Sequence, residues 1–362
     1  CNEKNLQNYY KFIKVIGRYS MKNLFYLFSS IFLLFISLSI FSGQISKVNN
    51  IDIWWDSYGK ESDPPLLMIM GLNANSQHWP EDFIKELVDR NLYVVIFDNR
   101  DTGKSTWINK ENFFVKLIKI SPNFVKKWFT DLIFGSMLDE EGRFNIEGLP
   151  SSYNIKDMSA DAIGLMNNLG IDKFHILGVS MGGMIAQQTA IDYPDNILSL
   201  TSWMSSPGFN VEGLKGPEPF FVEAIKQSAL LNFQNKQRES ILHIYEKQTG
   251  SKYDFNQSEY LERVNRILIH GENSNSGHML AVGASENRLN TLPNMNIPSL
   301  VIHGTEDPLI PFDHGKKTHS LINNSKFIAL EGVGHEFVKE QYEFIASEIY
   351  NHIINIKGEA DE

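Results

Sequence analysis

A serine flanked by two glycines lies near the middle of the chain, in the sequence GVSMG at residues 178–182. The apolar run FHIL precedes it, and a helical pattern of apolar residues follows it. Between a strand and a helix, this spacing is typical of a nucleophile elbow, a turn so tight that Gly178 and Gly182 cannot carry side chains. Because such a turn exposes the serine hydroxyl at the start of the helix, we predict that Ser180 is a nucleophile.

A serine hydroxyl needs a neighbouring base to take its proton before it attacks a carbonyl group. His335 is the predicted base, because it lies on a glycine-containing loop between the apolar run KFIAL and the last helical stretch. We expect packing roles for His175 and His303, and we expect His78 to line the site. The remaining histidines lie in cap or helical stretches and are expected to be solvated: His243, His270, His278, His314, His319 and His352.

The acid that orients the histidine is predicted to be Asp307, which lies in a turn after the apolar run SLVIH. Its carboxylate would hold His335 in one tautomer and stabilise the imidazolium ion that forms during the reaction. The neighbouring Glu306 is the alternative acid. The loop after Ile197–Trp203 offers no carboxylate, since its sequence is MSS.

Two backbone amides are the predicted donors to the oxyanion of the tetrahedral intermediate. The N–H of Met181 directly follows the nucleophile, and the N–H of Leu72 follows Gly71 in the loop after the apolar run PLLMIM. Asn73 is a further contributor to consider. An ordinary turn at the end of a strand would explain the Gly71 loop without any oxyanion role.

Arg100 lies in the sequence DNRDTGKS, after another apolar run. We expect its role to be structural, with the guanidinium bracing neighbouring loops through several hydrogen bonds. Phosphate binding is not expected here, because the segment lacks the G-x-x-x-x-G-K-S/T spacing.

Short apolar runs alternate with helical stretches, which predicts an α/β fold with a mostly parallel central sheet and helices on both faces. The site residues all fall at the carboxyl ends of predicted strands, where such sheets carry their active sites. The predicted strands cover residues 50–58, 65–70, 92–98, 173–179, 197–203, 299–303 and 326–330. The predicted flanking helices cover residues 81–90, 158–169, 181–193 and 337–354.

Two insertions interrupt this pattern within the predicted domain at 44–358, one at 108–156 and the other at 207–294. The second is predicted to form a helical cap, with helices at 220–233, 238–248 and 258–268. In the first, apolar residues recur at helical spacing across 113–133, and Lys116, Lys119, Lys126 and Lys127 lie among them. This pattern suits a helix lying on a membrane surface. It suits equally a cap helix packed on the core, which we favour.

The first 43 residues read as a leader rather than as part of the fold. Residues 1–20 are mainly polar. We interpret them as an extension upstream of the true translation start, which we expect at Met21, because the pattern of an export signal begins there. Lys22, an apolar run at 24–41 and the small residues Ser42 and Gly43 then resemble an export signal. The run is also long enough for an uncleaved anchor. The protein is therefore expected to be exported, either periplasmic or secreted, or to be membrane-anchored.

Composition narrows the classes of partner. The chain has 362 residues and a formal net charge of −10, which argues against nucleic-acid binding because that needs a basic surface. Its single cysteine, Cys1, allows neither an internal disulfide nor a cysteine-based metal site.

Three segments together resemble the α/β-hydrolase family, and within it the aclacinomycin-methylesterase-like hydrolases. They are MGLNANSQHWP at 70–80, DNRDTGKST at 98–106 and GVSMGG at 178–183. Met70-Gly71 and Arg100-Asp101 replace the His-Gly and Arg-Gly pairs of many family members, as in that subgroup, whereas the 108–156 insertion departs from it. The resemblance implies hydrolysis of a small apolar carboxylic ester, a methyl ester among the candidates, with neither metal nor organic cofactor.

Two alternative functions remain open at this stage. An amide hydrolase related to prolyl aminopeptidases would need an acidic group in the cap to hold the substrate amine, and Glu218, Glu223 and Glu239 are available. A non-catalytic ligand-binding protein on the same fold is the other alternative, although the intact Ser180, Asp307 and His335 argue against it.

Overall fold

The computed structural model describes residues 43–360, except residues 112, 141 and 272–275. The chain divides into two units, Cys1–Gln44 and Ile45–Glu362. The predicted upstream extension at 1–20 lies outside the described residues, as does the predicted signal or anchor at 21–43 apart from Gly43. The described fold is therefore that of the second unit.

Eight strands form one sheet in the order β1-β2-β4-β3-β5-β6-β7-β8. They are β1 (Gln44–Val48), β2 (Ile51–Tyr58), β3 (Pro65–Ile69), β4 (Tyr93–Phe97), β5 (Phe174–Val179), β6 (Ile197–Trp203), β7 (Ser299–Gly304) and β8 (Lys326–Leu330). β2 is antiparallel to β4, and every neighbouring pair from β4 to β8 is parallel. The predicted mostly parallel sheet is confirmed, and the loops that follow its parallel strands share one edge.

The central strands are apolar on both faces because helices cover both sides of the sheet. In β3, Leu66 and Met68 belong to one hydrophobic cluster, whereas Leu67 and Ile69 belong to the other. All four side chains are almost completely buried. Each such burial contributes about 1.5–3 kcal/mol to folding, so the alternation fixes which residues face each helical layer.

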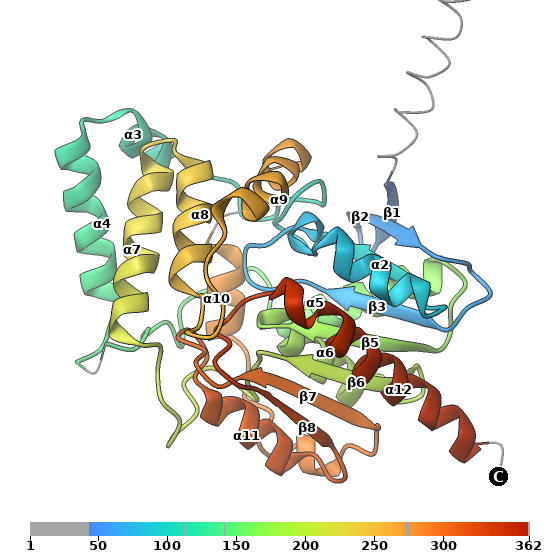
Figure 1. The fold of residues 1–362 in the computed structure, drawn as a ribbon. Helices are drawn as coiled ribbons and strands as arrows, with labels where there is room; N and C mark the ends of the chain where they lie inside the picture. Colours follow the sequence, from blue (N-terminus) through green and yellow to red (C-terminus); the bar gives the residue numbers. More distant parts are fainter. Residues whose placement is uncertain (1–42, 112, 141, 272–275, 361–362) are drawn as a thin grey trace, which may run out of the picture. The chain divides into compact units, whose positions relative to one another are not determined.

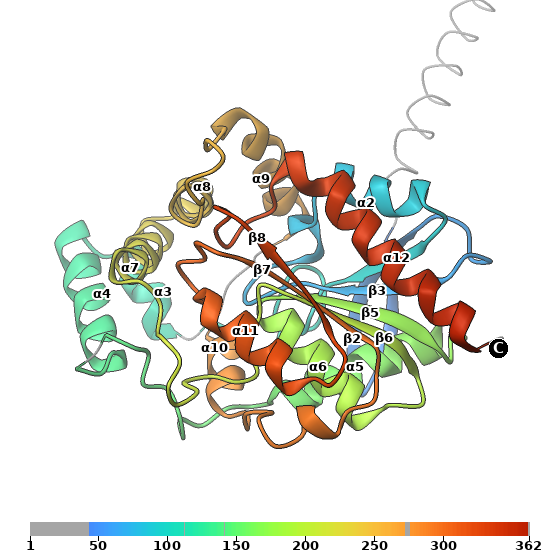
Figure 2. The ribbon, with the colours of Figure 1, turned by 60° about the horizontal axis from the view of Figure 1, so that its bottom comes forward.

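The flanking helices are α2 (Glu81–Asp89), α5 (Ile155–Asn168), α6 (Met181–Asp192), α11 (Phe312–Leu321) and α12 (Tyr342–Ala360). α2 and α12 pack on one cluster through residues such as Phe83 and Ile345, and α5 and α6 pack on the other through Met158 and Ile185. The two ribbon views show the sheet between these layers (Figures 1 and 2). Together the layers hold the strand ends, and the loops that follow them, in fixed positions.

The helices of the two insertions lie beside the sheet (Figure 1), apart from the last of them, whose Ala281 and Val282 belong to the hydrophobic cluster of α5 and α6. They are α3 (Phe113–Ile120) and α4 (Asn123–Met137) in the first, and α7 (Pro219–Phe233), α8 (Gln237–Lys247), α9 (Gln257–His270) and α10 (Gly277–Gly283) in the second. α7 packs against both α4 and α8. Within the described ranges, no helix combines the length and the apolar character needed to cross a bilayer.

The α3–α4 hairpin has an inner face that packs and an outer face that does not. On the inner face, Phe129 lies 5.5 Å from Phe233 of α7 between ring centroids, and Ile118 and Phe134 are buried. The outer apolar face is exposed and consists of Phe113, Leu117, Ile120, Phe124, Trp128 and Leu132. Packing on the cap therefore accounts for only part of the apolar pattern at 113–133.

Some elements differ from those that the sequence predicts. Three elements of the structure, β1, α10 and α11, are absent from the prediction. β1 is a largely exposed edge strand and α11 has the mainly polar sequence FDHGKKTHSL, so neither has the apolar pattern on which the prediction depends. The final helix begins at Tyr342 rather than at Phe337. The aromatic ring of Phe337 packs between Trp79 and Trp203, 5.2 Å from each between centroids, and a short 3₁₀ turn, Lys339–Gln341, follows it.

Candidate active site

Ser180 lies at the junction of β5 and α6 in a backbone conformation that few side chains adopt, with φ 57° and ψ −125°. Such a conformation costs on the order of 1–3 kcal/mol and persists only where the surrounding packing imposes it. The Ser180 side chain makes no capping hydrogen bond to α6. The hydroxyl group of Ser180 therefore does not stabilise the start of α6.

Three glycines make this turn sterically feasible. A Cβ atom at Gly182 would collide with the backbone of Ile69 in β3, and one at Gly178 would collide with the Gly182 carbonyl group. A Cβ atom at Gly71 would lie 3.0 Å from the Cβ of Ser180. The three chain segments meet here more closely than side chains would permit.

Asp307 and His335 form a buried hydrogen-bonded pair at the ends of β7 and β8. Asp307 Oδ2 lies 2.6 Å from His335 Nδ1, while Asp307 Oδ1 accepts hydrogen bonds from the amides of Leu309 and Ile310 at 2.9 and 2.8 Å. Burial alone would raise the pKa of Asp307, but His335 and His303 hold it well below its usual range. An ionised Asp307 assigns the Nδ1 proton to His335, which leaves Nε2 free to act as a base.

Glu306, the alternative acid, points elsewhere. Its carboxylate accepts hydrogen bonds from the amide and the hydroxyl group of Ser251, both at 2.7 Å. His303 Nε2 donates to the carbonyl of Ile310 at 2.8 Å and lies 3.5 Å from Asp307. The sequence predicts only packing for His303, but it also lies beside the buried carboxylate.

Cap residues support the loop that carries His335. The His335 amide donates to the carbonyl of Gln248 at 2.9 Å, and the amide of Lys252 donates to the carbonyl of Gly332 at 3.0 Å. The amide of Gly250 donates to the buried Glu336 carboxylate at 2.9 Å. The segment after α8 therefore fixes the position of the histidine.

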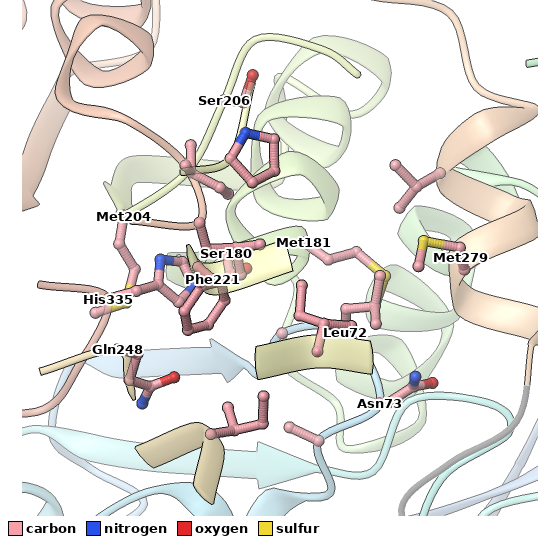
Figure 3. Close-up of a pocket in the computed structure, with 18 of the residues that line it drawn as sticks. Leu72, Asn73, Ser180, Met181, Met204, Ser206, Phe221, Gln248, Met279 and His335 are labelled. Atoms are coloured by element: carbon pink, nitrogen blue, oxygen red, sulfur yellow. The ribbon is translucent and has the colours of Figure 1, made fainter. Parts of the chain in front are cut away.

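Ser180 and His335 line the same cavity, and both are labelled in Figure 3. Among the described residues, the Ser180 hydroxyl has no hydrogen bond to His335 or to another side chain. Catalytic hydrogen bonds are often long before substrate binds, so the arrangement is compatible with proton transfer from the hydroxyl to Nε2.

The cavity has a volume of about 420 Å³ and lies between the sheet edge and the cap. Its walls are mainly apolar, with Met204 and Met181 on the sheet side and Phe221, Ile225 and Ile244 from α7 and α8 on the cap side. His78 lines it, as predicted. Within the described part of the chain, no aspartate or glutamate contributes to these walls, and no cluster of His, Cys, Asp and Glu could hold a metal ion.

Leu72 and Met181 line the cavity together with Ser180. In the part of the chain that the structure describes, neither backbone N–H donates to a protein acceptor. A free N–H beside a nucleophile is what a developing oxyanion requires. The N–H of Asn73, by contrast, donates to His278 Nδ1 at 2.9 Å and is not available to a substrate.

Hydrogen bonds from the segment after β4 hold the Leu72 loop in place. The Asn99 amide group donates to the carbonyl of Met70 at 3.0 Å, and the Asp98 carboxylate accepts from the amide of Ser76 at 2.8 Å. Hydrogen bonds therefore fix the loop before Leu72, at Met70, and after it, at Ser76.

Arg100 braces this region. Its guanidinium group makes two hydrogen bonds to the carboxylate of Asp161 in α5, at 2.7 and 2.8 Å, and a longer one to the carbonyl of Asp157. Its own carbonyl oxygen lies 2.6 Å from His278 Nε2. Arg100 is not among the described residues that line the cavity of Ser180, so its contacts support the predicted structural role.

Four of the histidines expected to be solvated are buried instead: His270, His278, His314 and His352. His270 Nε2 lies 2.7 Å from Asp98 Oδ2, and burial lowers the pKa of both His278 and His352 to about 4. Asp98 and His270 are 172 residues apart in the chain. No local sequence pattern signals such partners, which is why their burial was not predicted.

Comparison with known proteins identifies the family. A family model described as the alpha/beta hydrolase fold matches residues 64–342. The chain belongs to the alpha/beta hydrolase family. This alpha/beta hydrolase is 22% identical over 330 residues to the rhodomycin D methylesterase DnrP of Streptomyces peucetius, a match that covers 84% of this chain and 95% of DnrP. The rhodomycin D methylesterase DauP of Streptomyces sp. (strain C5) is 21% identical over 324 residues, with the same coverage.

Solved structures place this alpha/beta hydrolase among proteins of the same fold. An esterase from Thermogutta terrifontis matches with a TM-score of 0.61 at 19% identity, over 87% of this chain and 99% of its own. An enol-lactonase from Burkholderia xenovorans LB400 matches with a TM-score of 0.58 at 16% identity, over 86% of this chain and 100% of its own. The predicted family, and the resemblance to methylesterase-like members, are confirmed.

Proposed function

We propose that this alpha/beta hydrolase cleaves a carboxylic ester through an acyl-enzyme intermediate on Ser180. The observation that carries the proposal is that one cavity is lined by a serine whose hydroxyl group has no partner among the described residues, by a histidine paired with a buried carboxylate, and by two residues with free amides. The likeness to two methylesterases over most of their length supports an ester substrate.

In the proposed mechanism, His335 Nε2 takes the hydroxyl proton of Ser180 as Oγ bonds to the ester carbonyl carbon. The amides of Leu72 and Met181 donate hydrogen bonds to the resulting oxyanion. His335 then gives the proton to the departing alcohol oxygen, which leaves an acyl-serine. Water, deprotonated by the same histidine, attacks the acyl carbonyl and releases the carboxylic acid and the free serine.

The shape and chemistry of the cavity favour a small apolar ester. Its lining is mainly apolar, and its volume of about 420 Å³ lies within the range of small-molecule sites. The amide-hydrolase alternative loses its expected anchor, because Glu218, Glu223 and Glu239 are absent from the described lining.

Turnover of a panel of p-nitrophenyl and methyl esters, combined with labelling by a fluorophosphonate probe, tests the proposed function. We expect hydrolysis of short and medium apolar acyl esters, and covalent labelling of the peptide that contains Ser180. Peptidyl and aminoacyl amides of matched size should react far more slowly. A protein that neither turns over any ester nor reacts with the probe would instead be a non-catalytic ligand-binding protein.

We also propose that the outer apolar face of the α3–α4 hairpin lies on a lipid surface. Phe113, Ile120 and Phe124 are each at least 75% exposed, and Phe124, Trp128 and Leu132 lie four residues apart on one side of α4. Of the five lysines at 108–133, Lys110, Lys116 and Lys127 are exposed, whereas Lys126 is buried and Lys119 pairs with Glu111. Aromatic side chains with lysines beside them suit the surface of an anionic bilayer.

The change Phe124→Asp with Trp128→Asp is expected to weaken binding to vesicles that contain phosphatidylglycerol by at least about tenfold, because it places two charges in the apolar face. The measurement is co-sedimentation of protein beginning at residue 43, so that the apolar run at 24–41 does not contribute. Ile269→Asp is the matched control, since Ile269 is 85% exposed but belongs to α9. Equal vesicle binding by the double variant and the control would contradict the proposal.

We further propose that the protein is exported, periplasmic or secreted, or is held at a membrane by residues 24–41. The sequence of residues 21–43 supports this proposal. The mass of the protein isolated from its native cells distinguishes a cleaved signal from a retained anchor.

A further inference from the structure

The imidazole ring of His278 in α10 bridges the loops that follow β3 and β4. Its Nε2 lies 2.6 Å from the carbonyl oxygen of Arg100, and its Nδ1 lies 2.9 Å from the backbone nitrogen of Asn73. A carbonyl oxygen only accepts hydrogen bonds, and a backbone N–H only donates them. The proton of His278 is therefore on Nε2, and Nδ1 accepts from Asn73.

His278 is held in this neutral tautomer. The side chain is completely buried, and burial lowers the pKa of its imidazole to about 4 against the opposing effect of the Arg100 carbonyl. Tyr153 packs edge-on against the ring, 6.5 Å away between centroids. At neutral pH the ring thus offers one donor and one acceptor in fixed directions.

The Asn73 amide belongs to the turn that carries Leu72. The amide of Ala74 donates to the carbonyl of Gly71 at 3.2 Å, so Leu72 and Asn73 are the two central residues of a four-residue turn. Asn73 has a φ of 57°, the left-handed conformation that the second central residue of a type II turn requires. The His278 hydrogen bond holds the peptide group between these two residues in one orientation.

We propose that His278 is a positioning residue for ester hydrolysis, which fixes the Gly71–Ala74 turn so that the Leu72 N–H meets the oxyanion. The inference rests on the proposed function. His278 lies in α10, 205 residues along the chain from Asn73, from whose backbone N–H it accepts a hydrogen bond. Because a displacement of about 1 Å in such a donor can cost 10²-fold in rate, loss of the bond should reduce kcat.

Two amide substitutions separate the two hydrogen bonds of His278. In His278→Asn, the side-chain oxygen lies near the position of Nδ1 and can accept from Asn73, but the side chain does not reach Arg100. In His278→Gln, the side-chain nitrogen can donate to Arg100, but no acceptor lies near Asn73. Both replacements are neutral and polar, so they differ chiefly in which bond survives.

We expect His278→Gln to lower kcat by about 10–100-fold with KM changed by less than about threefold. Affinity for a boronic acid, which forms a tetrahedral adduct with the serine, should fall by a similar factor. His278→Asn should keep kcat within about fivefold of the wild-type value. His352→Gln is the control, because His352 is also buried but packs near Pro298, before β7 and away from the site.

Amide hydrogen exchange of the peptide containing Asn73 gives a readout that needs no turnover. Exchange should be faster in His278→Gln than in the wild-type protein and in His278→Asn. Unchanged exchange, or equal kcat in His278→Gln and wild type, would overturn the inference. Equal losses of kcat in both variants, in step with a lower unfolding temperature, would also overturn it by showing a purely structural role. A wild-type protein without esterase activity would refute the proposed function alone.

Discussion

Replacing Ser180 by alanine is expected to lower kcat for a p-nitrophenyl ester by about 10⁶-fold, the scale seen when a serine nucleophile is removed from a triad. In the proposed mechanism the acyl intermediate forms on Ser180, so in the variant only hydrogen bonding to the oxyanion would still accelerate attack by water. The Ser180 side chain makes no capping hydrogen bond to α6, so the unfolding temperature should change little. Steady-state kinetics and thermal unfolding of the same preparation measure both effects.

The control for Ser180→Ala is Ser320→Ala, which removes a hydroxyl group on the exposed side of α11. The control should keep full turnover and full labelling by the fluorophosphonate probe, whereas Ser180→Ala should show neither. Residual turnover of more than a few per cent in Ser180→Ala would mean that another residue is the nucleophile.

Replacing Asp307 by asparagine is expected to lower kcat by about 10⁴-fold while KM changes little. The carboxylate accepts the Nδ1 proton of His335 at 2.6 Å, and an amide group that donates there would favour the tautomer with its proton on Nε2. In that tautomer His335 cannot take the proton of Ser180. Because its neighbours keep the pKa of Asp307 below its usual range, the wild-type rate should show no inflection from this carboxyl group above about pH 4.

Glu306→Gln is the matched control for Asp307→Asn, since the two carboxylates are neighbours in sequence but have different partners. Glu306 accepts hydrogen bonds from Ser251, so its replacement should leave kcat within about threefold. If Glu306→Gln were instead the more damaging change, the acid would be the residue that the structure places away from His335.

The central site residues could be predicted from the sequence because their signals are local. Ser180 directly follows an apolar run that forms a strand, and Asp307 and His335 lie in the loops that follow two other such runs. Parallel strands bring the loops that follow them to one edge of the sheet. The sequence signal of Gly178 and Gly182 is also local, because both glycines lie two residues from Ser180 and the turn around Ser180 requires them. Local order along the chain is therefore sufficient to select these residues as candidates.

Residues that act through distant partners could not be predicted in this way. His278 and Asn73 are 205 residues apart, and neither lies in a pattern that points to the other. The same applies to the α3–α4 hairpin. Helical spacing predicts its helices, but only the position of α7 decides that Phe129 faces inward while Phe124 and Trp128 face outward.

The hydrogen bonds that join residues 207–294 to the loops carrying His335 and Leu72 limit how the protein can be re-engineered. The carbonyl of Gln248 holds the amide of His335, and His278 holds the amide of Asn73. A chimaera that exchanged residues 207–294 for the cap of another hydrolase would exchange these supports together with the substrate-binding wall. Under the proposed function, an exchange that alters substrate selectivity would therefore also alter turnover, unless the new cap supplied equivalents of both contacts.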